Sequence, residues 1–391
     1  MEQEVYESYI GGYKWRSSDK IYYKLTGRKI NSKYFPTIPV SVSYLPDLIP
    51  NKNLFGLFWS TPTFKDTDCQ YLFHVYDEYD IDIVISTSSG NTVESMANVI
   101  KRYNQESKKK IKAILLVPEI SSFKVSKNAI ENNPYVYYIV LKNSTLDSIR
   151  EFASKLKEKL LERFNVILAD ANLKTAAYSQ VGFVLDHMNL LNDDVCFVQT
   201  VSGGVCPAGV IEYASLYDIN PEFLVVQPFD SKTTPIIDAL NEHSVGHDPF
   251  EIFKKQNYET SNIETTLGST KPLYAIEKFI QWREHGGKVL AAKISQEELC
   301  NQKNKVLKLL VDVGIYPTID LALKFFELEK SGIIAFIGAI KSAKKINSNN
   351  IIVNFTGRYP EKNSFFPSSA TPHILYNPEQ GIEHLITMLN I

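Results

Sequence analysis

The fold is decided by the stretch DIVISTSSGNTVESMANVI, residues 82–100, in which a strand pattern changes into a helix pattern at a small polar loop. The segment Ile83–Ile85 is β-branched without interruption, which is typical of a strand buried on both faces. Such a strand, running through a glycine-containing loop into a helix, places hydroxyls, an amide and backbone N–H groups where anions bind. An ordinary turn capped by Asn91 is the simpler interpretation of this fragment alone. The apolar residues after the loop recur at helical spacing, at Val93, Met96, Ala97 and Ile100.

Strand and helix patterns alternate through the rest of the chain. This alternation predicts a mostly parallel sheet covered by helices, in which ligands collect beyond the carboxyl ends of the strands. Residues 230–267 are polar, and we expect an irregular segment there. The helix that begins at Ser295 has Glu298 at the capping-box spacing. Strands are predicted at 111–118, 135–141, 193–200, 222–228 and 349–357, and helices at 144–164, 271–285 and 295–314.

Composition excludes several functional classes. The 391 residues are 44% hydrophobic and 22% charged with a net charge of −2, which is typical of a globular protein and gives no sign of a nucleic-acid partner. The four cysteines form no C-x-x-C pair, so neither a zinc site nor a disulfide framework is expected. No apolar run has the length of a membrane span or the character of a signal peptide. We therefore expect a cytoplasmic protein without a membrane partner.

The stretch STPTFKDTDCQYLFHVY, residues 60–76, contains a single lysine, Lys65. Apolar residues from Cys69 onward recur at helical spacing, which places Lys65 just before or in the first turn of a helix. The positive end of a helix disfavours a charged ammonium, and a neutral lysine amine can attack an aldehyde. A solvated surface lysine is the ordinary alternative.

A small-residue turn lies in VQTVSGGVCPAGVIEYASL, residues 198–216. A strand ends near Thr200, and a helix follows with Pro207 near its start, as helices prefer. Glycines allow backbone N–H groups to converge on an oxyanion, so the turn is a candidate phosphate cradle. Most glycine pairs are ordinary turns, and this reading stays open for the turn considered alone.

The order of these three stretches, followed by a strand that ends in Thr-Gly, resembles the fold type II pyridoxal-phosphate enzymes. Within that group the chain is most similar to threonine synthase and its relatives. The resemblance covers residues 60–358, loosely in identity and consistently in order. Further segments that match the family in order are LKTAAYSQV at 173–181, LGSTKPLYAI at 267–276, VGIYPTIDLAL at 313–323 and IIVNFTGR at 351–358.

The resemblance implies an α/β fold with two parallel-type open sheets covered by helices. A small domain, residues 70–162, would be inserted in a large domain formed by 1–69 and 163–391. The small domain would move toward the large one when substrate binds. The family also implies a homodimer.

The resemblance further implies that the cofactor is pyridoxal 5'-phosphate and assigns residues to hold it. Lys65 would carry it as a Schiff base, and Asn91 would bind the ring hydroxyl oxygen. Thr356 would face the pyridine nitrogen, where a hydroxyl is a weaker partner than a carboxylate, so the ring nitrogen need not be protonated. The phosphate would be wrapped by Ser202, Gly203, Gly204, Val205 and Cys206.

An amino-acid substrate is implied as well, with its carboxylate bound by residues of the polar loop and Lys174 nearby. The reaction would be elimination or replacement at the β or γ carbon. Two departures bear on the substrate: Thr67 stands where the family has an arginine, and the residues just ahead of Lys174, VILADANL at 166–173, include no arginine. Alternatives are a β-replacement synthase of the cysteine, cysteate or diaminopropionate type that acts on a serine derivative, and a catalytically diverged paralogue that binds the cofactor. The loop residues implied to bind the carboxylate are Ser88, Ser89 and Thr92.

Overall fold

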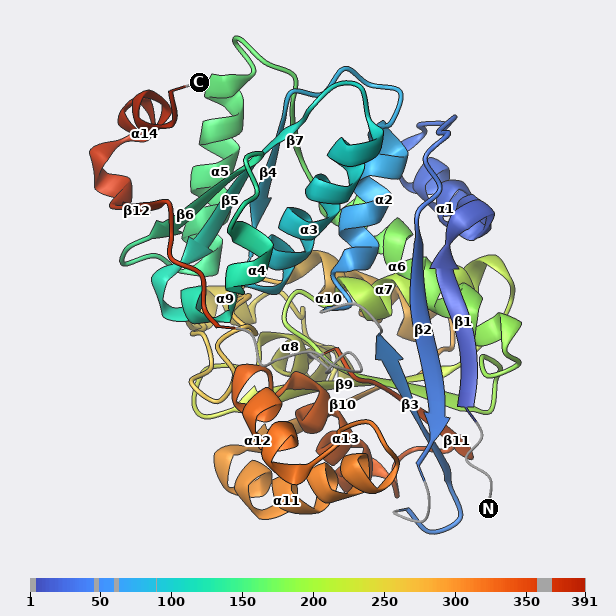
Figure 1. The fold of residues 1–391 in the computed structure, drawn as a ribbon. Coiled ribbons are helices and arrows are strands. Elements are labelled where there is room, and N and C mark those ends of the chain that lie inside the picture. The colour runs from blue at the N-terminus through green and yellow to red at the C-terminus, as the bar shows by residue number, and fades with distance from the viewer. Residues whose placement is uncertain (1–4, 46–48, 60–62, 89, 357–367, 391) are drawn as a thin grey trace. The chain divides into compact units, whose positions relative to one another are not determined.

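The computed structural model describes residues 5–45, 49–59, 63–88, 90–356 and 368–390, and the chain forms two compact units (Figure 1). The α/β class and the two mostly parallel sheets expected from the sequence are confirmed. Unit 1 is made of Met1–Ile30, Phe35–Thr67 and Ala171–Phe366, and unit 2 of Asn31–Tyr34, Asp68–Asp170 and Pro367–Ile391.

Unit 1 contains a seven-stranded sheet in the order β1-β2-β3-β11-β8-β9-β10. The pairings β1–β2 and β2–β3 are antiparallel, and the other four are parallel. The antiparallel end of this sheet was not predicted from the sequence. The strands are β1 (Val5–Gly11), β2 (Thr37–Tyr44), β3 (Asn53–Trp59), β8 (Val195–Thr200), β9 (Glu222–Phe229), β10 (Val289–Ser295) and β11 (Asn350–Asn354).

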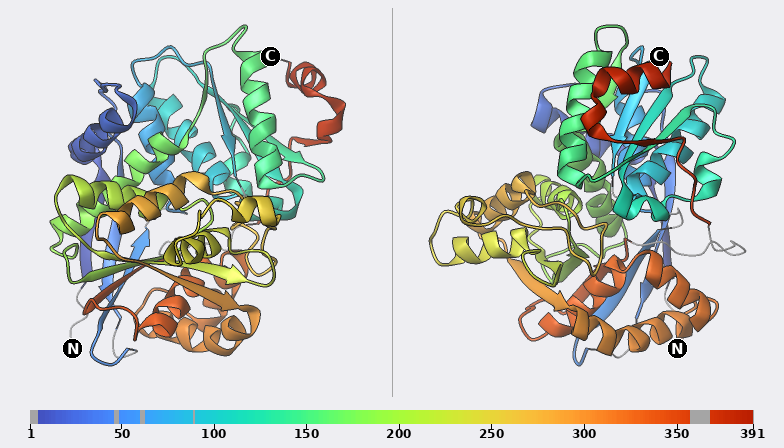
Figure 2. Two further views of the ribbon diagram at one scale, coloured as in Figure 1. Left: turned by 180° about the vertical axis from the view of Figure 1, so that it is seen from behind. Right: turned by 90° about the vertical axis from the view of Figure 1, so that its left-hand side faces the viewer.

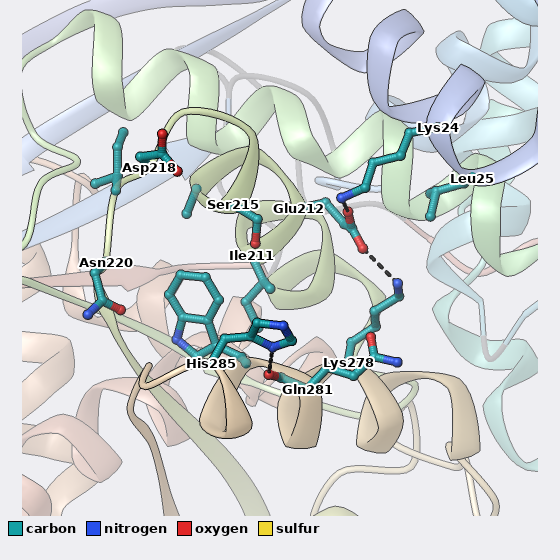
Figure 3. Close-up of a pocket in the computed structure, with 13 residues that line it drawn as sticks. Lys24, Leu25, Ile211, Glu212, Ser215, Asp218, Asn220, Lys278, Gln281 and His285 are labelled. Carbon is teal, nitrogen blue, oxygen red and sulfur yellow. Dashed lines mark hydrogen bonds and ion pairs between the residues drawn. The ribbon is translucent and has the colours of Figure 1, made fainter.

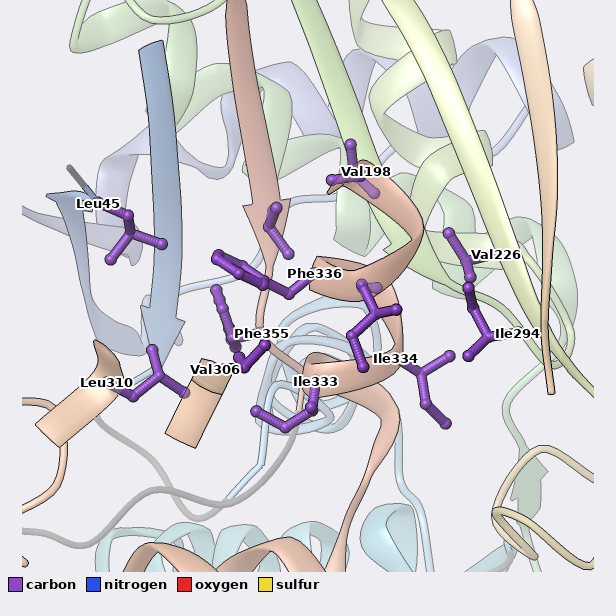
Figure 4. Packing of buried hydrophobic residues seen from close by; sticks show 14 of the residues in the cluster. Leu45, Val198, Val226, Ile294, Val306, Leu310, Ile333, Ile334, Phe336 and Phe355 are labelled. Carbon is purple, nitrogen blue, oxygen red and sulfur yellow. The ribbon is translucent and has the colours of Figure 1, made fainter. Parts of the chain in front are cut away.

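Helices cover both faces of this sheet, as strand β9 shows. Leu224 and Val226 point to the cluster that contains the buried side chains of α11, α12 and α13 (Figure 4). Phe223 points the other way, because side chains alternate along a strand, and its ring meets Trp282 of α10 at 5.7 Å between centroids. The helices of unit 1 are α1 (Arg16–Thr26), α6 (Ala171–His187), α7 (Val205–Leu216), α8 (Pro235–Ser244), α9 (Ile252–Lys255), α10 (Leu273–Glu284), α11 (Gln296–Asp312), α12 (Ile319–Leu328) and α13 (Ser331–Ser342), with the 3-10 helix η1 (Gly12–Trp15).

Unit 2 contains a five-stranded sheet in the order β12-β6-β5-β4-β7, with all four strand pairings parallel. Its strands are apolar on both faces, as the sequence predicted for Ile83–Ile85. The elements are β4 (Ile83–Thr87), β5 (Lys112–Pro118), β6 (Val136–Leu141), β7 (Val166–Leu168), β12 (Ile374–Tyr376), α3 (Asn91–Glu106), α4 (Lys127–Ile130), α5 (Leu146–Leu160), α14 (Ile382–Leu389), η2 (Glu119–Lys124) and η3 (Pro378–Gln380), and α2 (Asp66–Tyr76) begins at the end of unit 1.

The C-terminal segment completes unit 2. Strand β12 pairs with β6, with Ile374 opposite Ile139, and α14 packs beside α5 (Figure 2). The resemblance implied that every residue from 163 to 391 belongs to the large domain. That assignment is wrong for the last part of the chain, because the apolar side chains of Tyr376, Leu385 and Leu389 are buried in the core of unit 2.

Most predicted elements of the parallel sheets are present. Helix α11 begins after Ser295, which forms the predicted capping box with Glu298. The expectation of an irregular segment at 230–267 is wrong for the residues of α8 and α9, whereas residues 256–267 contain neither helix nor strand, as expected. The first turn of α8 is held by Gln227, a residue of strand β9. Gln227 Oε1 accepts hydrogen bonds from the N–H groups of Ile236 and Ile237 at 3.1 and 3.2 Å.

Among the described residues, no helix combines the length and the apolar composition that crossing a membrane requires.

Candidate active site

Three neighbouring strands of unit 1 lead into the three predicted cofactor segments. Strand β11 lies between β3 and β8 and is parallel to both. The carboxyl ends of the three strands therefore meet at one edge of the sheet. Lys65 follows β3, Thr356 follows β11, and the glycine turn at 202–206 follows β8. Segments almost 300 residues apart in the sequence are brought to one place by this strand order.

Lys65 lies immediately before helix α2, as the sequence predicted. Its backbone N–H donates to Thr63 Oγ1 at 3.0 Å. The Nζ atom lies 4.3 Å from the ring centroid of Phe64 and 5.3 Å from that of Tyr178, which belongs to α6. The lysine stem is half-buried, and its amine rests on two aromatic faces, which hold it at the sheet edge.

The glycine turn has the shape of an anion cradle. Gly204 precedes α7 with φ +68°, a left-handed conformation that suits glycine. A Cβ atom on Gly204 would lie 2.5 Å from Cβ of Ala275, whereas one on Gly203 would meet nothing within 4 Å. Ser202 Oγ accepts a hydrogen bond from the N–H of Ser269 at 3.0 Å, which ties the turn to the segment before α10. Gly203 thus faces open space, whereas Gly204 is packed against Ala275.

The remaining cradle residues begin helix α7. Val205 is its first residue, and Cys206 follows with its thiol buried. Backbone N–H groups in the first turn of a helix have no intrahelical partner, so this turn can offer donors to a phosphate. The donor set and the free space over Gly203 fit a cofactor phosphate.

Thr356 follows β11 and is 4% exposed. Its Oγ1 lies 2.9 Å from Oγ of Ser331, the first residue of α13. The hydroxyl of Thr356 therefore has a buried hydrogen-bond partner, which the sequence alone could not identify.

A buried row of polar side chains joins the three strand ends. Trp59 Nε1 donates to Asn354 Oδ1 at 2.9 Å, and Asn354 Nδ2 donates to Gln199 Oε1 at 2.9 Å. Asn354 Nδ2 also lies 3.6 Å from Sγ of Cys206 in the cradle. This row was not predicted from the sequence. The available signal was a polar residue near the end of each apolar strand, at Gln199 in VCFVQT and at Asn354 in NIIVN.

Helix α6 supports the site from one side. Lys174 lies in its first turn, four residues before Tyr178, so both side chains leave the same face of the helix. Helices α6 and α7 approach closely at Gly209, where a Cβ atom would lie 2.5 Å from the carbonyl oxygen of Thr175. The role predicted for Lys174 in substrate binding stays a prediction.

The polar loop with which the sequence analysis began lies in unit 2. It follows β4, and Asn91 is the first residue of α3, with Gly90 before it at φ +118°. Ser88 Oγ accepts a hydrogen bond from the N–H of Thr92 at 3.1 Å, and the side chains of Ser88, Asn91 and Thr92 are each less than a tenth exposed. Ser89 lies outside the described residues. The predicted strand–loop–helix is present, and the roles given to its residues stay predictions.

Solved structures share this architecture, although no protein-family model matches the sequence and no curated protein matches it. Threonine synthase from Escherichia coli aligns with a TM-score of 0.60 and 13% identity over 88% of this chain and 77% of that one. A pyridoxal 5'-phosphate-dependent aspartate racemase aligns with 0.58 and 14% identity over 88% and 96%. The chain has the fold of the fold type II pyridoxal-phosphate enzymes. Maize serine racemase also aligns, with 0.58 and 15% identity over 89% and 95%, so this fold is shared by a synthase and by racemases.

Unit 1 of this fold type II chain has a further pocket of about 600 Å³, between α1, α7 and α10 (Figure 3). It includes none of the candidate residues above. Its wall contains Glu212, whose carboxylate accepts from Lys278 Nζ at 2.7 Å and from Lys24 Nζ at 2.9 Å. Burial raises the pKa of Glu212, but the hydrogen bonds and charges of the two lysines outweigh it and hold that pKa below its usual value. The three side chains form an ion-pair network in that wall.

Proposed function

We propose that the protein is a pyridoxal-phosphate-dependent enzyme that acts on an amino acid. The observation that carries the proposal is the meeting of Lys65, Thr356 and the 202–206 turn at the ends of three adjacent parallel strands. Lys65 would hold the cofactor covalently, the turn would bind its phosphate through backbone N–H groups, and Thr356 would face its ring nitrogen. The bound cofactor would supply an electron sink next to the substrate nitrogen.

Residues of this chain would move the protons and anchor the substrate. The amine of Lys65, once displaced from the cofactor, can take and return a proton at the α and β carbons of the substrate. The aromatic rings of Phe64 and Tyr178 keep that amine at the sheet edge. The loop residues Ser88, Ser89 and Thr92 at the N-terminus of α3 are the proposed anchor for the substrate carboxylate, and Asn91 would bind the ring hydroxyl oxygen of the cofactor.

Within this class we infer elimination or replacement at the β or γ carbon, with replacement on a serine derivative as the second candidate. The feature that favours the second candidate is the absence of an arginine ahead of Lys174, where the preceding residues are VILADANL. Without that guanidinium, a substrate phosphate loses a bidentate charged partner. Hydrogen bonds to charged groups contribute about 1.5–3 kcal/mol each, so phosphohomoserine should bind about ten-fold to over a hundred-fold more weakly than at a site that keeps the arginine.

The first test concerns the cofactor. The purified protein is incubated with pyridoxal 5'-phosphate, reduced with borohydride, digested and mapped by mass spectrometry. We expect the pyridoxyl group on Lys65 and none in the K65A variant. Lys52 is an internal control, because its Nζ donates to the carbonyl oxygens of Ile346 and Ser348, at 3.2 and 2.7 Å, and should stay unlabelled. Labelling of Lys52 or Lys174 in place of Lys65 would overturn the proposal.

The second test concerns the reaction. Phosphohomoserine, O-phosphoserine and O-acetylserine are assayed side by side for release of the leaving group and for the amino-acid product. Because racemases share the fold, L-serine and L-aspartate are included with chiral analysis. Rapid threonine formation from phosphohomoserine would contradict the argument from the missing arginine. Racemisation without elimination or replacement would move the protein to another reaction class.

A further inference from the structure

The pocket between α1, α7 and α10 is separate from the proposed cofactor site. All of its lining residues belong to unit 1, and none of them lies in the three segments that meet at the sheet edge. Its volume of about 600 Å³ is within the range of pockets that hold small molecules. Apolar side chains such as Ile211 and Trp282 line it together with charged and polar ones. This mixture is typical of a site for a polar small molecule.

Positive charge is in excess on one side of the pocket, at the lysine pair formed by Lys24 and Lys278. The two oxygens of the Glu212 carboxylate accept one hydrogen bond from each lysine. Glu212 is ionised at neutral pH, because the two lysines hold its pKa below the usual value. Among the described residues, neither lysine has a second ion pair. Two ammonium groups therefore share one negative charge, and one positive charge stays unbalanced.

The lysine pair also has hydrogen-bond donors to spare. Each ammonium group has three N–H donors and uses one of them on Glu212. In the part of the chain that the structure describes, neither ammonium group makes another hydrogen bond. The side chain of Lys278 is 16% exposed, compared with 56% for that of Lys24, so its spare donors have little contact with bulk water. An oxyanion in the pocket would satisfy these donors and balance the charge.

The rest of the pocket offers hydrogen-bond acceptors. Figure 3 shows Asp218 and Asn220 across the pocket from the lysine pair. His285 Nδ1 lies 2.6 Å from the carbonyl oxygen of Gln281, and a carbonyl oxygen only accepts, so Nδ1 carries a proton. In the neutral form of this ring, Nε2 is therefore an acceptor. Carboxylate, amide and imidazole acceptors suit a ligand with hydroxyl groups.

We propose that this pocket binds a small hydroxylated compound that carries a phosphate or a carboxylate group. The oxyanion accepts hydrogen bonds from the spare donors of the lysine pair, and the hydroxyl groups donate to Asp218 and Asn220. The pocket is a second site of the molecule, so the inference does not depend on the proposed function. The alternative is an ion-pair network that only joins the three helices, and such a network requires no ligand.

Isothermal titration calorimetry with the whole protein tests the proposal. Glucose 6-phosphate supplies the phosphate, D-gluconate supplies the carboxylate, and glucose has hydroxyl groups without an anion. We expect at least one of the two anionic probes to bind with a dissociation constant of about 1 mM or lower, because two hydrogen bonds to charged groups are enough for that affinity. Glucose should bind at least about ten-fold more weakly than that probe. The tighter of the two anionic probes identifies the preferred oxyanion.

Variants of the lysine pair show whether the probe binds in this pocket or in the turn at 202–206. K278M keeps an apolar stem without the ammonium group and should weaken binding of the anionic probe about ten-fold or more. K24M should weaken binding in the same direction, and it gives the measurement if K278M does not fold. K20M is the matched control, because Lys20 is an exposed residue of α1, one turn before Lys24, and does not line the pocket. It changes the net charge equally and should bind the probe like the wild type.

Three results would overturn the inference: no binding of either anionic probe, binding of glucose as tight as theirs, or wild-type affinity in both K278M and K24M. An equal loss of affinity in K20M would also overturn it, because the effect would then come from the net charge alone. Failure of the proposed function looks different, since borohydride would then attach no pyridoxyl group to Lys65. A labelled Lys65 in a protein that binds neither probe rejects the inference and leaves the proposed function standing.

Discussion

Replacing Gly204 by alanine tests the geometry of the glycine turn. Gly204 has φ +68°, and an L-residue in the left-handed region costs about 1–2 kcal/mol. The new Cβ atom would lie 2.5 Å from Cβ of Ala275, and relieving such an overpacked contact costs about 1–3 kcal/mol. Together the two effects predict that G204A lowers the free energy of unfolding of unit 1 by about 2–5 kcal/mol.

Two other glycines serve as matched controls. Gly286 has φ +87°, but a Cβ atom there would meet nothing within 4 Å, so G286A should lose only the backbone part, about 1–2 kcal/mol. A Cβ atom on Gly203 also meets nothing within 4 Å, and the stability of G203A should stay within about 0.5 kcal/mol of the wild type. G203A should nevertheless bind cofactor more weakly, because its methyl group points into the space proposed for the phosphate.

The assay is urea unfolding in the absence of cofactor, followed by tryptophan fluorescence. All three tryptophans, Trp15, Trp59 and Trp282, belong to unit 1, so the signal reports that unit alone. Linear extrapolation gives the free energies to compare. A G204A protein that unfolds within 0.5 kcal/mol of the wild type, or no more easily than G286A, would refute the reasoning.

Three further predictions follow from other contacts. Lys278 and Lys24 hold the pKa of Glu212 below 4.5, so its ion pairs stabilise the fold above about pH 4.5 and are lost as the pH falls below that value. Thermal unfolding measured from pH 7 to pH 3 should therefore depend less on pH in E212Q than in the wild type. N354L should destabilise unit 1 by about 1–3 kcal/mol for each buried polar group that it leaves unsatisfied, measured by the same urea assay. With a coloured thiol reagent, the native protein should react quickly only at the exposed Cys300. The three buried thiols should react only after unfolding, so a fast reaction of the native C300S variant would contradict this prediction.

The sequence predicted the parallel parts of the fold well, because their signals are local. Uninterrupted β-branched runs such as Ile83–Ile85 and the capping box at Ser295 are strong patterns within a few residues. The position of Lys65 before a helix was predicted for the same reason and is confirmed. Helix α8 was missed because its first N–H groups are held by Gln227, a contact that no local pattern contains.

The connections within the candidate site could not be predicted in this way. The row Trp59, Asn354 and Gln199 joins residues 155 and 295 positions apart in the sequence, and only the strand order makes them neighbours. The hydrogen bond between Thr356 and Ser331 depends likewise on where α13 begins relative to the end of β11. Sequence patterns predicted which residues would meet a cofactor, whereas the side chains that contact those residues emerge only from the packing.

The place of strand β12 sets the order in which the protein can be completed during synthesis. The other four strands of its sheet are complete once Leu168 has been made, but the edge strand Ile374–Tyr376 and helix α14 follow only after the second half of unit 1. The edge strand β6 therefore stays unpaired while the second half of unit 1 is translated. An exposed parallel edge of this kind is a site where chains can pair wrongly, so binding by chaperones should concentrate on the β6 edge until β12 has been made and pairs with it.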